Sequence, residues 1–370
     1  MKVAWVVRPA EGGILIHLNH LRNGLAKQYE ILVCGPEELR EWAGDFKFYP
    51  IEIRDGIHPK DDLKAIWTLR QYLHTERPVL VHMHGLKGAF IGVPAAKFSK
   101  CNRLVFTAHN CLPKHASHWH QLSHGLIQRY LFNGLHRIIC VSDAVRDDFI
   151  HLVPEHRVLT IRNGVVCQDF EGFSRAESRA AAGIPSKNTV IGVIARLIPE
   201  KGIINLLEAA SLMKNINQNI SFVIVGDGPS RSQFEGYRDR LGLGSYVRFL
   251  GHRDDVPFLL AGWDLFVLPT LSEGFSVSVL EAMAAHLPLV VSDLPSMREM
   301  VTPGHSGYLV RPKDSPGLAA AMLHITKDLP KARAMGEYNY QRVKRMFGTD
   351  RMVESTGNIY NELITREFLW

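Results

Sequence analysis

The sequence predicts an α/β fold of two domains, each built around a parallel sheet. At 370 residues the chain is too long for one ordinary hydrophobic core. Short apolar runs alternate with helical patterns from the start of the chain, which is typical of strands and helices that build a parallel sheet. Several runs end in glycine-rich turns, where a backbone can approach a ligand closely.

The first domain is predicted to comprise residues 1–168 and about 350–370. A strand over residues 3–7 leads to Gly12 and Gly13, and then to an apolar stripe at helical spacing. A strand, two glycines and a helix form a loop where phosphate can meet a helix N-terminus, so Gly13 is a candidate phosphate-binding residue. A turn that needs only positive φ would have the same sequence.

Two later strands of this domain end at histidines. Strands are predicted over residues 31–34, 78–83, 103–107, 138–142 and 158–161. His84 and His109 follow the second and third of these, at the carboxyl ends where open α/β sheets bind ligands. We therefore expect His84 and His109 to lie near a ligand. Either histidine could instead be a structural cap to a loop carbonyl.

A histidine-rich segment with a central Trp119 follows. His120 and His124 would share a helical face, but neither carboxylate nor cysteine accompanies them, so the sequence does not favour a metal site. An amphipathic, basic face that meets a ligand or a membrane fits better, and Trp119 is a candidate contact residue of that face. The histidines of this segment are His115, His118, His120, His124 and His136.

The second domain, residues 169–349, is predicted to begin with a hinge. Residues 169–188 are rich in Ser, Arg, Ala and Gly, and a hinge would let two domains close over a donor. Arg196 ends the next strand and Lys201 begins a helix, so the two cations could converge on a diphosphate. They could also be solvated surface charges. The chain has no Asp-x-Asp, so an acidic metal chelate is not indicated.

A strand, a turn and a helix near residue 270 carry the strongest motif. A strand over residues 265–268 precedes a polar turn, and two glutamates eight residues apart flank the helix that follows. The free amides at the positive end of this helix favour an anion or an oxygen-rich ligand. An ordinary turn with acidic residues near a helix N-terminus is the alternative. The candidate binding residues are Glu273, Gly274, Phe275, Ser276, Val277 and Glu281.

The composition indicates a globular protein without a membrane span. Apolar residues make up 46% of the chain, and no run of about 20 apolar residues occurs. We see no signal peptide and expect a cytoplasmic protein. The five cysteines include no C-x-x-C pair, so neither a disulfide framework nor a zinc site is indicated.

The net charge of +6 comes from the first half of the chain. Up to Gly164, Lys and Arg outnumber Asp and Glu by 21 to 15, whereas the remainder has 22 of each kind. Residues 77–142 contain no Asp or Glu. This half therefore favours an anionic partner such as a phospholipid surface or a lipid-phosphate acceptor, unless its charges only solubilise the domain. No nucleic-acid-binding motif accompanies the high pI.

These motifs resemble the family-four, group 1 type of retaining glycosyltransferases with the GT-B fold. The resemblance rests on the E-x7-E pair Glu273 and Glu281, on Arg196 with Lys201, and on the Thr-Ala-His-Asn stretch around His109. It implies two Rossmann-like domains facing a central cleft, with a last helix around residues 352–363 that crosses back to pack on the first domain. The family's usual glycines are replaced by Ala195 and His286.

The resemblance implies transfer of a sugar from a UDP- or GDP-linked donor to an acceptor hydroxyl, with retention. Arg196 and Lys201 would bind the diphosphate, Glu273 the sugar hydroxyls and Glu281 the ribose, while His109 positions the sugar. His84 and Trp119 would contact the acceptor. The nucleobase would lie near Gly228, His252 and Arg253. Because no carboxylate nucleophile is apparent, front-face substitution is expected. We expect neither a cofactor nor a metal.

The expected acceptor is a lipid-linked saccharide of surface polysaccharide or lipopolysaccharide assembly, reached from a peripheral position on the inner membrane leaflet. Two other classes fit the same architecture. One is a non-hydrolysing nucleotide-sugar epimerase, which needs no acceptor, and the other is a non-catalytic protein that binds nucleotide sugars.

Overall fold

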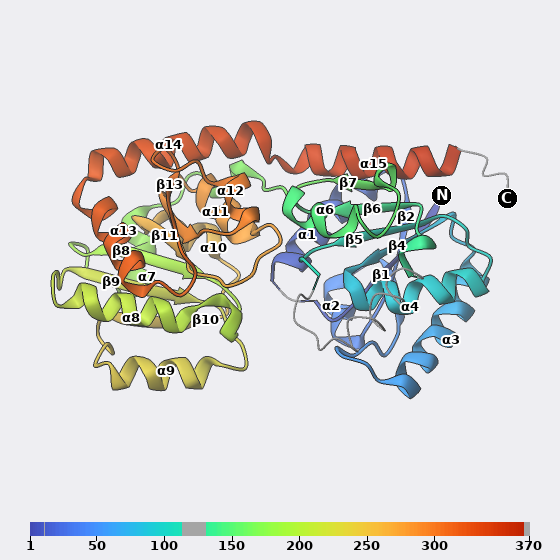
Figure 1. The fold of residues 1–370 in the computed structure, drawn as a ribbon, viewed down its shortest axis with the longest axis horizontal. Helices are drawn as coiled ribbons and strands as arrows, with labels where there is room; N and C mark the ends of the chain where they lie inside the picture. Colours follow the sequence, from blue (N-terminus) through green and yellow to red (C-terminus); the bar gives the residue numbers. More distant parts are fainter. Residues whose placement is uncertain (11, 113–130, 366–370) are drawn as a thin grey trace. The chain divides into compact units, whose positions relative to one another are not determined.

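The computed structural model describes residues 1–10, 12–112 and 131–365, and these form two compact α/β units (Figure 1). The first unit comprises Met1–Asn163 and Asp350–Trp370, and the second comprises Gly164–Thr349. We expected the boundary after residue 168, but residues 164–168 belong to the second unit. Val165 explains the difference, since its N–H donates to the Phe347 carbonyl at 3.0 Å and its own carbonyl accepts from Thr349 at 3.3 Å.

The first unit is built on a seven-stranded parallel sheet with the order β3-β2-β1-β4-β5-β6-β7. The strand order reverses between β1 and β4, which makes this edge the switch point where ligands bind in open sheets. The sequence did not reveal β3, a four-residue edge strand with little buried surface. The strands are β1 (Lys2–Val7), β2 (Glu30–Gly35), β3 (Lys47–Pro50), β4 (Leu80–His84), β5 (Leu104–Ala108), β6 (Arg137–Cys140) and β7 (Val158–Thr160).

Helices cover both faces of this sheet (Figure 1). The last of them, α15, packs on the first unit as predicted. Its Tyr360 is fully buried and accepts a hydrogen bond from the Trp5 indole at 3.0 Å. The described helices are α1 (Gly13–Leu25), η1 (Glu37–Leu39), α2 (Arg40–Ala43), α3 (Pro59–Glu76), α4 (Gly85–Phe98), α6 (Asp143–Phe149), η2 (Glu155–Arg157) and α15 (Thr349–Thr365).

The second unit has a six-stranded parallel sheet with the order β10-β9-β8-β11-β12-β13, which reverses between β8 and β11. Its strands are β8 (Thr189–Ile194), β9 (Ile220–Val225), β10 (Val247–Gly251), β11 (Leu265–Leu268), β12 (Leu289–Ser292) and β13 (Gly307–Val310). Its helices are η3 (Cys167–Phe170), α7 (Arg175–Ala181), η4 (Pro199–Lys201), α8 (Ile203–Lys214), α9 (Arg231–Arg240), α10 (Val256–Ala261), α11 (Val277–Ala284), α12 (Pro295–Met300), α13 (Ser315–Lys327) and α14 (Leu329–Met346).

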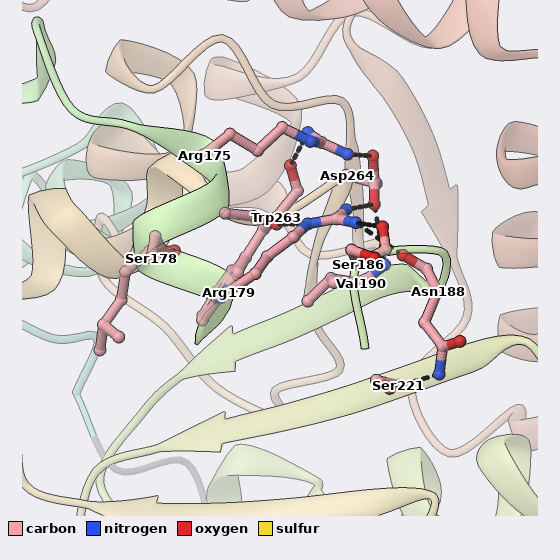
Figure 2. Close-up of polar contacts among 11 residues, drawn as sticks. Arg175, Ser178, Arg179, Ser186, Asn188, Val190, Ser221, Trp263 and Asp264 are labelled. Carbon is pink, nitrogen blue, oxygen red and sulfur yellow. Dashed lines mark hydrogen bonds and ion pairs between the residues drawn. The ribbon is translucent and has the colours of Figure 1, made fainter. Parts of the chain in front are cut away.

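The segment predicted as a hinge, residues 169–188, is instead anchored on the second unit. It contains α7, whose Arg175 and Arg179 both donate to the carboxylate of Asp264 (Figure 2). Arg179 also donates to the Gly262 carbonyl at 2.8 Å and to the Ser186 carbonyl at 2.8 Å. These contacts attach the segment to the second unit.

None of the helices in the described part of the chain combines the length and the apolar character needed to cross a bilayer. His115, His118, Trp119, His120 and His124, which the sequence suggested for acceptor or membrane contact, lie outside the described residues.

Candidate active site

Two loops meet at the switch point of the second unit. One follows β8 and contains η4, and the other follows β11. The Glu200 carbonyl accepts hydrogen bonds from the Leu271 amide at 2.7 Å and from the Thr270 hydroxyl at 3.1 Å. Gly202 has φ +68°, and a Cβ added there would lie 2.0 Å from the Pro269 carbonyl oxygen. Only glycine permits this approach, so Gly202 lets the two loops close on each other.

The closure of these loops brings Lys201 to Glu273. Their Nζ and Oε2 atoms lie 2.5 Å apart, with 21% and 13% of the side chains exposed. Ser296, buried at the start of α12, donates to the Glu273 carbonyl at 2.7 Å and fixes the backbone of the turn. The sequence placed Lys201 and Glu273 at one site, but nothing in the pattern around Ser296 indicated its role.

Arg196 lies exposed on the same loop as Lys201. Its backbone is placed by the turn after β9, because the Leu197 amide donates to the Asp227 carbonyl at 2.8 Å. A Cβ on Gly228 would lie 2.6 Å from the Leu197 carbonyl oxygen, so this glycine allows the two turns to pack. Gly228 thus supports the Arg196 loop whether or not it also contacts a ligand. Ala195 is accommodated in place of the glycine that the resemblance led us to expect.

Glu281 is buried in α11 and carries the most perturbed carboxyl of this site. The helix begins at Val277 after Ser276, whose hydroxyl accepts from the Val279 amide at 3.4 Å. Only 8% of Glu281 is exposed, and burial raises its pKa from 4.5 to about 8. A carboxyl that is protonated at neutral pH can both donate and accept hydrogen bonds, which suits a ligand with neighbouring hydroxyls.

This raised pKa predicts that the protein loses stability as the pH rises. The folded state keeps the Glu281 proton between pH 4.5 and about 8, where the unfolded chain has lost it. Stability should therefore fall across this window, by on the order of 3 kcal/mol at pH 7. We expect Glu281→Gln to unfold at the wild-type temperature at pH 4 and at a higher temperature at pH 8. Thermal unfolding at both pH values measures this difference.

Glu354→Gln is the matched control because Glu354 is exposed on α15. Its unfolding temperature should follow the wild type at both pH values. An unfolding temperature for Glu281→Gln that does not exceed the wild-type value at pH 8 would contradict the assignment of the raised pKa.

The two residues predicted to lie near a nucleobase, His252 and Arg253, follow β10 on the surface. The guanidinium of Arg253 pairs with the Asp255 carboxylate through contacts of 2.7 and 2.5 Å. His252 lies 3.2 Å from Asp254, with 75% and 98% of these side chains exposed. Neither residue belongs to the Lys201–Glu273 contact.

His286 occupies the position after α11 where the family usually has glycine. It has φ +55°, the left-handed conformation that normally favours glycine. Its ring stacks on Tyr340 with centroids 4.0 Å apart, and its Nδ1 lies 3.1 Å from a Glu337 carboxylate oxygen. These contacts fix the side chain of His286, whose backbone adopts the left-handed conformation of the turn.

The switch point of the first unit gathers three histidines. His84 ends β4, His109 follows β5, and the sequence missed His17, which lies on α1 after the positive-φ Gly12 and the helix start at Gly13. Nδ1 of His84 lies 3.4 Å from Nε2 of His109. Burial lowers the pKa of all three rings, so they are neutral at pH 7.

The burial of His84 corrects one prediction. Its exposure is 0%, so this side chain is part of the interior and offers no surface to an acceptor. A histidine at a strand end has the same sequence signal whether it faces solvent or the core. His109 keeps 8% of its surface exposed.

Comparisons with known proteins identify the family of the chain. The glycosyl transferases group 1 model matches residues 174–342, and the glycosyltransferase family 4 model matches residues 11–169. A UDP-Gal:alpha-D-GlcNAc-diphosphoundecaprenol alpha-1,3-galactosyltransferase of Escherichia coli is 25% identical over 83% of this chain and 81% of its own. A lipopolysaccharide core biosynthesis mannosyltransferase, LpcC of Rhizobium leguminosarum, is 28% identical over 66% of this chain and 69% of its own.

Among solved structures, Anabaena HepE in complex with UDP and glucose superposes with a TM-score of 0.85. It covers 98% of this chain and 100% of its own at 21% identity, which shows the common fold. The two family models together span both units. The chain therefore belongs to the group 1, family 4 glycosyltransferases with the GT-B fold.

Proposed function

We propose that this glycosyltransferase moves a sugar from a UDP- or GDP-linked donor to an acceptor hydroxyl with retention at the anomeric carbon. One observation carries the proposal. Lys201 and Glu273, a cation for phosphate and a carboxylate for sugar hydroxyls, lie 2.5 Å apart on two loops at the switch point of the second unit. The E. coli relative, whose name states UDP-Gal, supports a nucleotide-sugar donor.

The donor residues have distinct roles in this proposal. Lys201 and Arg196 stabilise the negative charge that develops on the leaving diphosphate. Glu273 exchanges its bond to Lys201 for bonds to sugar hydroxyls, and Glu281 binds the ribose. The amides at the start of α11, with Gly13, approach phosphate or sugar oxygens. His252 or Arg253 would reach the nucleobase after leaving its own carboxylate partner.

We propose that the substitution takes place on one face of the sugar. The bond from the anomeric carbon to the diphosphate oxygen breaks as the acceptor oxygen approaches the same face. The departing phosphate oxygen takes the acceptor's proton, so no protein base is required. His109 is neutral and buried, which suits a residue that positions a sugar hydroxyl.

A donor screen tests the proposal. The purified protein is incubated with UDP- and GDP-sugars, with and without saccharide acceptors, and release of the nucleoside diphosphate is measured. We expect acceptor-dependent release and an α-linked product from an α-linked donor, identified by NMR. An altered sugar without acceptor would indicate an epimerase, and binding without release would indicate a non-catalytic protein. A β-linked product would overturn retention.

The acceptor is proposed to bind in the first unit. A cavity of about 950 Å³ lies at the ends of β1, β2 and β3, and its lining includes the apolar residues Leu15, Ile51 and Ile53. Glu52 and Arg54 add polar groups at the same cavity. An apolar wall with charged groups fits a saccharide attached to a lipid, the class of acceptor that the name of the E. coli relative states.

We further propose that α3 and the end of α4 face an anionic membrane. Leu63 and Trp67 lie one turn apart on α3 with 68% and 57% exposure, and Phe98 at the end of α4 is 65% exposed. Arg70 links them, because its guanidinium lies over the Trp67 ring at 4.7 Å and its Nε donates to the Phe98 carbonyl at 3.3 Å. Aromatic side chains beside cations are typical of proteins that bind at a lipid interface.

The double variant Trp67→Ala, Phe98→Ala should bind anionic vesicles about tenfold more weakly, because each aromatic loses apolar burial in the lipid. Co-sedimentation with vesicles of anionic and of neutral lipid at low salt measures this change. Ile216→Ala, which removes an exposed apolar residue of the second unit, is the control and should bind as the wild type does. Equal binding of the double variant and the wild type would disprove this membrane face.

A further inference from the structure

Three buried histidines of the first unit point ring nitrogens at one another. His17 comes from α1, His84 from the end of β4 and His109 from the residue after β5. One ring nitrogen of each lies within 4.8 Å of those of the other two. Their exposures are 3%, 0% and 8%, so all three donor atoms lie in the interior.

Two of these histidines have a ring nitrogen without a hydrogen-bond partner. Nε2 of His17 and Nε2 of His84 are buried, and no described residue bonds to either atom. Nδ1 of His17 lies 2.9 Å from the Asn163 amide oxygen, which only accepts. Nδ1 therefore carries the proton, and Nε2 keeps a buried lone pair. A buried lone pair left unsatisfied as on His17 requires an explanation, such as a bound ion.

The distance between the His84 and His109 rings fits a shared metal better than it fits a direct hydrogen bond. The 3.4 Å between His84 Nδ1 and His109 Nε2 exceeds the usual hydrogen-bond length. Two nitrogen ligands on a tetrahedral zinc ion, each about 2.0–2.1 Å from the metal, are separated by about 3.3–3.4 Å. A metal held by Nδ1 of His84 and Nε2 of His109 would replace this long contact with two coordinate bonds, and Nε2 of His84 would then carry the proton of that ring.

We propose that His17, His84 and His109 form a binding site for a divalent transition metal ion of the zinc class. Three imidazoles and an open fourth position are a common zinc ligand set, and the absence of a carboxylate from the trio disfavours Mg²⁺ and Ca²⁺. Asn163 is the outer partner that sets the tautomer of His17, as such acceptors do around zinc-bound histidines. Because the rings are already neutral, binding displaces no proton from them.

This metal site is separate from a metal site that would neutralise the donor diphosphate. Lys201 and Arg196 are proposed to neutralise the diphosphate. If His109 also positions the sugar, which rests on the proposed function, a bound metal would occupy its ring nitrogen and lower turnover. The site itself does not depend on that role, so it is tested by binding and not by activity.

The test is metal titration of the whole purified chain after removal of metals with a chelator. Calorimetry with Zn²⁺ and the visible spectrum of added Co²⁺ should show one ion per chain in a tetrahedral site, and no binding of Mg²⁺. His17→Ala should weaken Zn²⁺ binding more than about 100-fold, and Asn163→Ala about 10- to 100-fold. His305→Ala, which removes an exposed histidine of the second unit, should bind as the wild type does.

Thermal unfolding without metal checks that each variant is folded, and His17→Gln replaces His17→Ala if the alanine variant is not. A wild-type chain that binds no Zn²⁺ or Co²⁺ would overturn the proposal. So would a His17 variant and an Asn163 variant that are both folded and bind as tightly as the wild type. Failure of this test would leave the proposed transferase function intact, because donor release is measured without added metal.

Discussion

Lys201→Ala is expected to lower kcat by about 10²–10³-fold, which corresponds to roughly 3–4 kcal/mol of lost transition-state stabilisation. Lys201 is held next to Glu273 by loops that are themselves fixed through Glu200, Gly202 and Ser296. The cation is therefore in place before the donor diphosphate begins to leave. Steady-state kinetics with the donor found in the screen measures the loss.

The same substitution should change the unfolding temperature little, because the Glu200 carbonyl still accepts from the Leu271 amide and the Thr270 hydroxyl and connects the two loops after the Lys201–Glu273 pair is lost. Lys187→Ala is the matched control, since Lys187 is an exposed lysine of the same unit, and its kcat should equal that of the wild type. Arg196→Ala should resemble Lys201→Ala in direction. Near-normal kcat in both variants would remove the proposed role of these cations.

Glu273→Gln distinguishes the role of Glu273 from that of Lys201. It keeps the shape of the side chain but weakens its hydrogen bonds to sugar hydroxyls, and it leaves Lys201 without its carboxylate. We expect a loss of kcat/KM for the sugar donor with little change in the affinity for the free nucleoside diphosphate. An equal loss of affinity for both ligands would place Glu273 on the nucleotide and not on the sugar.

The fold was predictable where apolar runs are short, buried and bounded by turn residues. The strand predicted at residues 265–268, for example, has the same bounds as β11. In contrast, β3 was missed because a short, half-exposed edge strand produces neither a buried run nor a clear alternation. Apolar patterns in the sequence indicate which residues are buried, and an edge strand buries few residues.

The candidate site was predictable to the extent that it lies in loops after strands. Lys201 and Glu273 are 72 positions apart, and the family resemblance assigned both to one donor site. They lie together because they follow neighbouring strands, β8 and β11. His17 and Ser296 were missed because they lie on helices, where a single polar residue near an apolar stripe has no pattern of its own. Their roles come from tertiary neighbours that only the fold reveals.

The segment at residues 169–188 was predicted wrongly because its tertiary contacts could not be read from the sequence. A composition rich in Ser, Arg and Gly predicted a hinge, but the partner of its arginines is Asp264, which lies far along the chain (Figure 2). Polar composition does not distinguish a solvated linker from a helix held by ion pairs. This contact also leads to the second large effect that we expect.

Asp264→Ala should destabilise the second unit by about 3–5 kcal/mol, because it leaves a buried guanidinium without its carboxylate. The Arg179 side chain is 7% exposed and that of Asp264 is 15% exposed. Asp264 also accepts from the Val190 amide at 2.8 Å, at the start of β8. Thermal unfolding should detect the change as a fall of about 2–4 °C for each kcal/mol in a domain of this size.

Asp254→Ala is the control for Asp264→Ala, because it removes an ordinary surface charge and not a buried ion pair. The Asp254 side chain is 98% exposed and pairs only with His252 among the described residues, so its loss should change stability by less than about 0.5 kcal/mol. Below its unfolding temperature Asp264→Ala should keep most of its kcat, since Asp264 lies at the start of β11 and the Lys201–Glu273 contact at the opposite end of this strand. Lys201→Ala should show the reverse combination, with stability kept and turnover lost. If Asp264→Ala and Asp254→Ala unfold at the same temperature, the anchoring of α7 does not hold the second unit together.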